Sequence, residues 1–221
     1  MRHLKLIPMI ILALLLSAIP VGNDNVKKAD AASLKIEGLQ TSSEYVNTNT
    51  SVNFSKMSAK TIVNRVGETF TMEQVRTGIP ASVMMAQFIL ESGYGKSKLA
   101  KKAKNYFGMK TQLSGNTWKN SYWNGKSSYT IVTREVYKGK TVRMKAKFRK
   151  YSSFRQSVMD HSSYLAYSKN GKKLRYKGLV GCKSYKKAAR IIGDGGYATG
   201  RSYERALISI IKKWNLTRFD V

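Results

Sequence analysis

Cysteine and histidine are almost absent from this chain, and their scarcity excludes several kinds of chemistry. Among 221 residues there is one cysteine, Cys182, and the two histidines are His3 and His161. A single cysteine cannot form an intrachain disulfide, and no cluster of histidine and cysteine has the spacing of metal ligands. Cys182 has no base near it in the sequence, so we expect a partly buried small side chain and not a nucleophile. We therefore expect no cofactor and no metal.

Acidic residues are also scarce, with 12 aspartates and glutamates against 40 lysines and arginines. The formal net charge of +28 predicts a surface that attracts polyanions, such as nucleic acid, anionic lipid or the teichoic acids of a Gram-positive wall. The basic residues are spread from Lys35 to Arg218, which argues against a nucleic-acid recognition element. Hydrophobic residues make up 42% of the chain, which is enough for a core and excludes global disorder.

The chain has one long apolar run, at its start. Arg2 and Lys5 precede residues 6–21, which are almost wholly apolar, and Ala29-Asp30-Ala31 follows as an A-x-A pattern. This order is typical of a secretory signal peptide over residues 1–31, and the run is short for a membrane span of roughly 20 residues. We predict a secreted protein, with a retained N-terminal anchor as the alternative. Cleavage near Ala31 removes four basic and two acidic residues and leaves a charge of +26.

Periodicity in the remaining sequence predicts a mainly helical α+β domain. Residues 32–55 are rich in serine, threonine and asparagine and indicate a flexible spacer, so the folded domain covers residues 56–221 and starts near Phe54. Apolar spacing predicts helices over residues 58–69, 81–92, 96–104, 154–168 and 185–192, and a last helix capped by Ser202. Residues 129–137 and 142–148 predict a β-hairpin whose outer face carries Arg143, Lys145, Lys147 and Arg149.

Glu91 is the acidic residue whose position is most unusual. It lies at the C-terminal end of a strongly apolar predicted helix, immediately before the breaker Gly93-Tyr94-Gly95. Apolar neighbours and the negative end of the helix dipole both disfavour a carboxylate, so they raise its pKa. A carboxylic acid that is still protonated near neutral pH can donate a proton to a leaving oxygen. The alternative is a glutamate that points to solvent at a helix end.

Four stretches of the sequence resemble, in order, the motifs of one family. They are AQFILESGYGKS at residues 86–97, NYFGMK at 105–110, AKFRKY at 146–151 followed by Asp160-His161, and GYAT at 196–199 followed by Tyr203. These stretches closely resemble the glucosaminidase family of bacterial autolysins, glycoside hydrolase family 73, and the resemblance covers roughly residues 57–216. It implies a lysozyme-like fold in which helices and a small β-lobe flank a long cleft. It also implies hydrolysis of the β-1,4 bond after N-acetylglucosamine in peptidoglycan.

The resemblance assigns roles to three residues. Glu91 matches the general acid of the family, Glu135 falls where the β-lobe supplies a second glutamate, and Tyr197 matches a tyrosine near the reacting sugar. Two departures bear on these roles: Val136 separates Glu135 from Tyr137, and Gly200 stands where the family commonly has aspartate. Glu135 could activate water, act as a nucleophile, or leave that step to the N-acetyl group of the substrate. The sequence does not choose among these mechanisms.

Aromatic side chains are expected to bind the sugar, since the flat C–H faces of sugars pack on rings. The candidates flank the acid or the hairpin: Tyr94, Tyr106, Phe107, Trp118, Tyr122, Trp123 and Tyr151. A core position is the stronger alternative for Phe107, and it is weakest for Trp118 and Trp123, which lie in polar sequence.

Two other functions compete with hydrolysis. A lytic transglycosylase would share the fold and the acid but leave an anhydro sugar, and a wall-binding module would use the cleft without catalysis. For the hydrolase we expect peptidoglycan as substrate, electrostatic contact with anionic wall polymers, and a location in the wall of a Gram-positive type of cell. No nucleic acid and no specific protein partner are expected.

Overall fold

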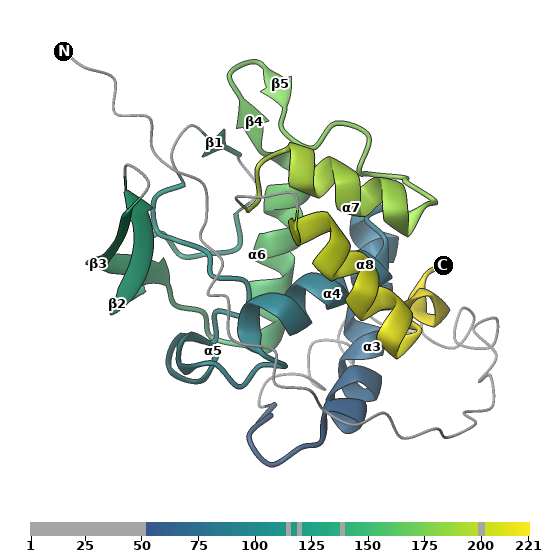
Figure 1. Ribbon diagram of the computed structural model, residues 1–221, viewed down its shortest axis with the longest axis horizontal. Helices are drawn as coiled ribbons and strands as arrows, with labels where there is room; N and C mark the ends of the chain where they lie inside the picture. The colour runs from purple at the N-terminus through teal and green to yellow at the C-terminus, as the bar shows by residue number, and fades with distance from the viewer. Residues whose placement is uncertain (1–51, 114–115, 119–120, 138–139, 199–201) are drawn as a thin grey trace.

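The structure is a computed structural model that describes residues 52–113, 116–118, 121–137, 140–198 and 202–221 (Figure 1). Within these ranges, residues 116–117, 133–137 and 140–142 are described by their backbone alone. The predicted signal peptide and the predicted spacer up to Ser51 lie outside the described residues, as do Thr199 and Gly200 of the fourth motif. No helix in the described ranges has both the length and the apolar character needed to span a bilayer.

The fold is mainly helical, as predicted, with two small antiparallel sheets. The helices are α3 (Ala59–Thr77), α4 (Ala81–Ser92), α5 (Lys98–Ala103), α6 (Phe154–Tyr167), α7 (Tyr185–Asp194), α8 (Ser202–Trp214) and the 3-10 turn η1 (Leu216–Phe219). β2 (Ser128–Tyr137) and β3 (Lys140–Arg149) form the hairpin, and β1 (Asn116–Thr117), β4 (Lys169–Asn170) and β5 (Lys173–Leu174) form the second sheet. The predicted helices are confirmed, although α3 runs eight residues beyond its predicted end at Thr69 and Ser202, the predicted cap, is the first residue of α8.

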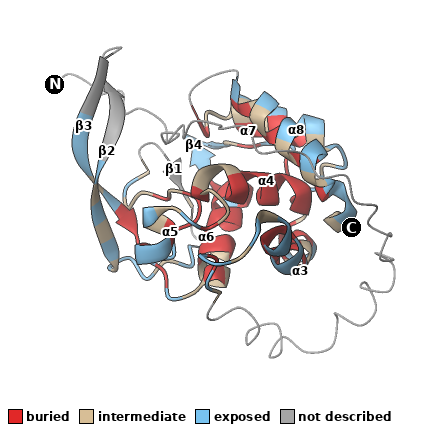
Figure 2. Cartoon of the chain, turned by 60° about the horizontal axis from the view of Figure 1, so that its bottom comes forward, coloured by how far each residue is buried: buried red, intermediate tan, exposed pale blue. Residues whose placement is uncertain are grey.

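Helix α4 lies at the centre of the domain and is buried on nearly every side (Figure 2). Helices α3, α7 and α8 and the turn η1 pack against it. Phe88 of α4 contacts the rings of Phe54, Phe70 and Phe154, so one aromatic cluster joins this helix to α3, to α6 and to the start of the described chain. An all-round apolar sequence therefore forms a central helix because only full coverage removes its side chains from water.

The start of α4 differs from the starts of α3, α5, α6 and α7. Serine side chains cap α3, α5, α6 and α7 by accepting hydrogen bonds from backbone N–H groups, through Ser58, Ser97, Ser153 and Ser184. At α4 the cap position is Pro80, whose side chain makes no capping bond. Two remote side chains supply the acceptors: Asp220 accepts from Ser82 N at 2.7 Å, and Gln74 accepts from Ala81 N at 2.8 Å.

The β2–β3 hairpin stands apart from the helices at one side of the domain (Figure 1). Its register pairs Tyr129 with Phe148 and Thr130 with Lys147. Phe148 is buried while Lys145 and Lys147 are exposed, so the predicted basic outer face is confirmed at these positions. The prediction was wrong for Arg149, which is only 5% exposed because it forms an ion pair with Asp160 of α6.

Helix α4 ends in a tight left-handed turn at which Gly93, Tyr94 and Gly95 all have positive φ values. A Cβ atom on Gly95 would lie 2.4 Å from the ring of Phe54. We expect Gly95→Ala to lower the free energy of unfolding by about 2–4 kcal/mol, through backbone strain and displacement of the ring.

Gly125→Ala is the matched control for this prediction. Gly125 has the same φ of 75° as Gly95, but a Cβ atom there would meet nothing within 4 Å. Its cost should be about 1–2 kcal/mol, from backbone strain alone. Urea denaturation of both variants measures the difference, and equal losses would contradict the packing of Phe54 on this turn.

Candidate active site

Glu91 occupies the last full turn of α4 and keeps part of its side chain at the surface. Its Oε1 accepts a hydrogen bond of 2.9 Å from the hydroxyl of Tyr203 in α8. Burial raises the pKa of Glu91 from 4.5 to about 7, and the hydrogen bond from Tyr203 opposes that rise. Near neutral pH this carboxyl is therefore divided between its protonated and ionised forms, as an acid that donates a proton at that pH requires.

A second layer of side chains holds Tyr203 in place. Its hydroxyl accepts a hydrogen bond of 3.1 Å from Gln87 Nε2, and its ring stacks on Tyr197 with centroids 5.7 Å apart. Burial raises the pKa of Tyr203 well above 10, so its hydroxyl stays protonated and donates to Glu91. Gln87 and Tyr203 were not predicted as site residues, although both lie in the recognised motifs. The four-residue spacing of Gln87 and Glu91 on one helix face was an available signal.

Tyr197 lies directly behind Tyr203 and is buried. Its hydroxyl is 3.4 Å from the carbonyl oxygen of Phe107, and the edge of its ring meets His161. Burial, the nearby Glu91 and neighbouring tyrosines raise the pKa of Tyr197 well above 10. The structure thus brings Glu91 and Tyr197 together, since both contact Tyr203.

His161 contributes packing and not proton transfer near neutral pH. Its ring stacks on Phe107 with centroids 3.8 Å apart, and burial lowers its pKa to about 3. It is therefore neutral across the physiological range. In the part of the chain that the structure describes, neither of its ring nitrogens has a hydrogen-bond partner.

The predicted sugar-binding aromatic residues fall into two groups. Tyr94, Trp118 and Trp123 are half-buried and Tyr122 is exposed, so these four can meet a ligand. Tyr106, Phe107 and Tyr151 are only 4%, 0% and 3% exposed and serve as packing residues in this structure. A sugar contact for these three stays a prediction, and it would require their rings to become exposed.

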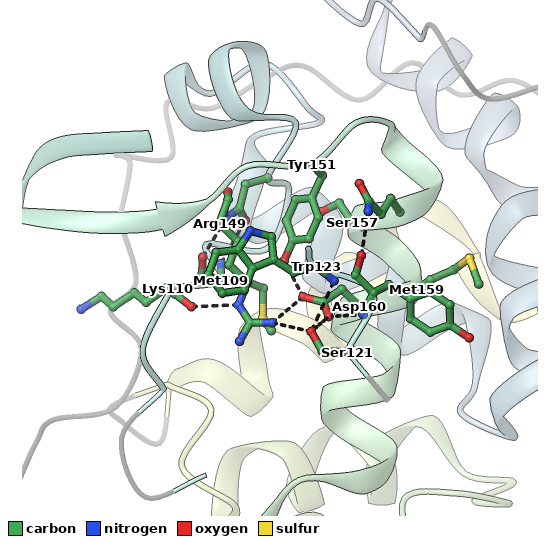
Figure 3. A network of polar contacts seen from close by, with 12 residues as sticks. Met109, Lys110, Ser121, Trp123, Arg149, Tyr151, Ser157, Met159 and Asp160 are labelled. Carbon is green, nitrogen blue, oxygen red and sulfur yellow. Dashed lines mark hydrogen bonds and ion pairs between the residues drawn. The ribbon is translucent and has the colours of Figure 1, made fainter. Parts of the chain in front are cut away.

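A polar network holds the loop that carries Trp123 against the end of the hairpin (Figure 3). Asp160 of α6 accepts hydrogen bonds from Arg149 at 2.8 Å, Tyr151 at 2.7 Å and Ser121 at 2.7 Å. Arg149 also donates to the carbonyl oxygen of Lys110 at 3.0 Å. The third motif, AKFRKY with Asp160-His161, thus joins the hairpin and the tryptophan loop to the helical core.

Glu135 lies in β2, where it pairs with Val142. It is six residues from Tyr129, and an even step along a strand returns to the same face. Its position therefore belongs to the face of the hairpin that also carries Tyr129 and Phe148. Its side chain is outside the described part of the structure, so its separation from Glu91 stays a prediction. Within the described residues, no three His, Cys, Asp or Glu side chains are grouped as a metal would require.

The raised pKa of Glu91 predicts a pH-dependent cost to stability. The carboxyl of Glu91 stays protonated in the folded protein up to about pH 7, but it ionises near pH 4.5 in the unfolded chain. The folded protein therefore loses stability as the pH rises from about 4.5 to about 7. Glu91→Gln lacks this loss. Its unfolding free energy relative to the wild type should increase by about 1–3 kcal/mol between about pH 4 and pH 8. Urea denaturation at both pH values measures this change.

Tyr203→Phe provides the internal comparison. It keeps the carboxyl of Glu91 but removes the hydrogen bond that favours ionisation, so its own loss of stability over the same range should exceed that of the wild type. An identical pH dependence in the wild type and in Glu91→Gln would show that the pKa of Glu91 is not raised.

Comparison with known proteins identifies the family. The model of the family described as mannosyl-glycoprotein endo-beta-N-acetylglucosaminidase matches residues 67–216. The exo-glucosaminidase LytG of Bacillus subtilis is 37% identical over 139 residues, which are 63% of this chain and 45% of LytG. A probable N-acetylmuramidase of Lactococcus lactis subsp. cremoris is 35% identical over 146 residues, or 65% of this chain and 31% of that protein. The chain thus spans less than half the length of either relative.

The fold is also that of a solved structure. The catalytic domain of the autolysin Auto from Listeria monocytogenes superposes with a TM-score of 0.62 at 27% identity, covering 89% of this chain and all of that domain. The predicted fold class and the family inferred from four motifs are both confirmed. The chain belongs to the glucosaminidase family of glycoside hydrolases.

Proposed function

We propose that this protein is a secreted N-acetylglucosaminidase that hydrolyses peptidoglycan glycan strands, with Glu91 as its general acid. The observation that carries the proposal is a carboxyl with a pKa of about 7 at the end of a buried helix. Family membership supports the reaction class, and two of the similar proteins are named an exo-glucosaminidase, LytG, and an autolysin, Auto.

The contacts of Glu91 suit both halves of a proton transfer. Burial keeps the proton on the carboxyl before reaction, so that it can move to the glycosidic oxygen as the bond to the sugar breaks. The hydroxyl of Tyr203 then stabilises the carboxylate that remains. Tyr197 is buried and stacked on Tyr203, so it would support the reaction by holding Tyr203 against Glu91.

We propose Glu135 as the second carboxylate. Three other acidic residues with described side chains have structural contacts, since Glu73 pairs with Arg76, Asp160 pairs with Arg149 and Asp220 caps α4. The hairpin face that carries Glu135 also carries Phe148, which packs into the domain. A separation of about 6.5–9.5 Å from Glu91 would give inversion and about 5 Å would give retention, while catalysis by the N-acetyl group of the substrate needs neither.

A muramidase is the second candidate, because one relative at 35% identity carries that name. The two hydrolases cut different bonds of the same strand and differ in the sugar left at the new reducing end. A lytic transglycosylase would instead leave an anhydro end.

Product analysis of digested walls tests the proposal. Purified peptidoglycan is digested with the wild type and with Glu91→Gln, the products are reduced with borohydride, and the new ends are identified by mass spectrometry. We expect reduced N-acetylglucosamine ends from the wild type and a loss of at least about 100-fold in Glu91→Gln. Glu68→Gln, an exposed glutamate on α3, should retain full activity.

The other outcomes are equally specific. Reduced N-acetylmuramic acid ends would leave Glu91 as the acid but show that the enzyme cleaves the other glycosidic bond of the strand. Anhydro ends would establish a transglycosylase. Equal activity in the wild type and in Glu91→Gln would show that Glu91 is not the general acid.

We also propose that the positive charge holds the protein on anionic wall polymers. Three of the acidic side chains in the described ranges are engaged within the fold, by Arg76, by Arg149 and by the start of α4, while lysines such as Lys145 and Lys147 face solvent. Exposed charges of this kind are screened by salt. The protein should therefore leave purified walls at about 0.5–1 M salt and bind weakly to walls stripped of teichoic acid. Retention that is unchanged in both conditions would contradict an electrostatic attachment.

A further inference from the structure

The guanidinium of Arg149 lies over the rings of two tryptophan side chains. The central carbon of its guanidinium is 4.6 Å from the ring centroid of Trp118 and 4.9 Å from that of Trp123. Figure 3 shows Trp123 beside this guanidinium and above the carboxyl of Asp160. Both indoles are half-buried, so each keeps part of its ring surface at solvent while Arg149 covers another part. This arrangement fixes the planes of both rings.

The remaining contacts of Arg149 make its own position rigid. Its Nη1 donates to Asp160 at 2.8 Å and to Ser121 at 3.1 Å, while its Nε donates to the carbonyl oxygen of Lys110. The same carboxyl accepts from the backbone N–H of Tyr122 at 2.8 Å. The guanidinium therefore joins the tryptophan loop, the end of β3 and helix α6 at one point.

A series of ring contacts runs from this point to the proposed acid. The ring of Trp118 meets that of Tyr164 edge-on with centroids 5.1 Å apart, and the centroids of Tyr164 and Tyr197 are 6.4 Å apart. Tyr197 stacks on Tyr203, whose hydroxyl binds Glu91. Trp118 thus belongs to the same series of ring contacts as Tyr203, which binds the acid, and Trp123 is joined to Trp118 through Arg149.

Stability alone does not account for the choice of arginine. A buried ion pair often contributes no more to stability than well-packed apolar side chains would. A lysine could balance the charge of Asp160, but its compact ammonium cannot stack on two indoles or donate in several fixed directions. Contact with both rings at once requires the planar guanidinium of arginine.

We propose that Arg149 is a positioning residue for glycan binding, which sets the orientation of Trp118 and Trp123 so that their outer ring faces receive the sugars of the strand. The guanidinium does not touch the reacting atoms and acts through the two indoles. This inference rests on the proposed function, because it assigns the glycan strand as the ligand of these rings.

The test is a binding measurement on the Arg149→Lys variant. Affinity for a purified peptidoglycan tetrasaccharide is measured by calorimetry in the Glu91→Gln background, so that the ligand is not consumed. We expect Arg149→Lys to weaken binding about fivefold to twentyfold and to reduce the near-ultraviolet circular dichroism of tryptophan. In the otherwise wild-type enzyme, KM should rise by a similar factor while kcat changes by less than about twofold.

Arg218→Lys is the matched control. Arg218 also lies over an aromatic ring, 4.4 Å from the centroid of Phe219, and donates to Asn64 at 2.8 Å, but it has no part in the tryptophan loop. Its affinity for the tetrasaccharide should equal that of the background protein. If Arg149→Lys does not fold, Trp123→Phe, which keeps Arg149 and Asp160, should show the same weakened binding.

The outcomes separate the two proposals. Unchanged affinity in a folded Arg149→Lys or Trp123→Phe variant would reduce Arg149 to a stabilising contact and overturn the inference. Absence of binding in the background protein itself would overturn the proposed function instead, and the inference with it.

Discussion

A helix that is apolar on every side must be covered on every side, and this constraint of α4 determines much of the domain. Helices α3, α7 and α8 and the turn η1 all pack against it. Its two ends carry different polar groups, and the buried Gln87 between them donates to Tyr203. Asp220 and Gln74 satisfy the N–H groups at its start, whereas its last turn holds Glu91. Because burial raises the pKa of Glu91, the packing that stabilises the core also makes this carboxyl an acid at neutral pH.

The buried carboxyl groups of this chain differ in the partner that each receives. Arginine side chains form ion pairs with Glu73 and Asp160 inside the domain. Glu91 receives a neutral hydroxyl from Tyr203 instead, which stabilises a carboxylate less than a cation does. Asp220 also has neutral partners, the backbone N–H and the hydroxyl of Ser82, and burial raises its pKa as well. Asp220, however, is engaged as the cap of α4, whereas one hydroxyl is the hydrogen-bond partner of Glu91 in the described part of the chain.

The sequence predicted features that depend on local periodicity and missed those that depend on remote contacts. Helix α4 was predicted with its observed bounds, since its apolar pattern and the glycines after it are local signals. Arg149 was placed on the outer face of the hairpin because alternation requires it there, yet Asp160 draws it into the domain. Tyr203 was not assigned to the site because it lies 112 residues from Glu91. The sheet of β1, β4 and β5 has strands of two residues, too short to show a period.

Two carboxyl groups that act on one sugar would obtain their positions from different physical sources here. The core fixes Glu91, because α4 is packed on all sides and Tyr203 binds its carboxyl. Glu135 lies on a two-stranded hairpin, and such a hairpin has little stability of its own. The inverting and retaining geometries differ by only a few ångströms, so the place where the hairpin joins the domain decides which one is reached. That place is the end of β3, where backbone hydrogen bonds join Thr111 to Lys147 and Arg149 to Met109. The position of a two-stranded hairpin must be set at its base, and these backbone bonds set it without depending on the side chain of Arg149.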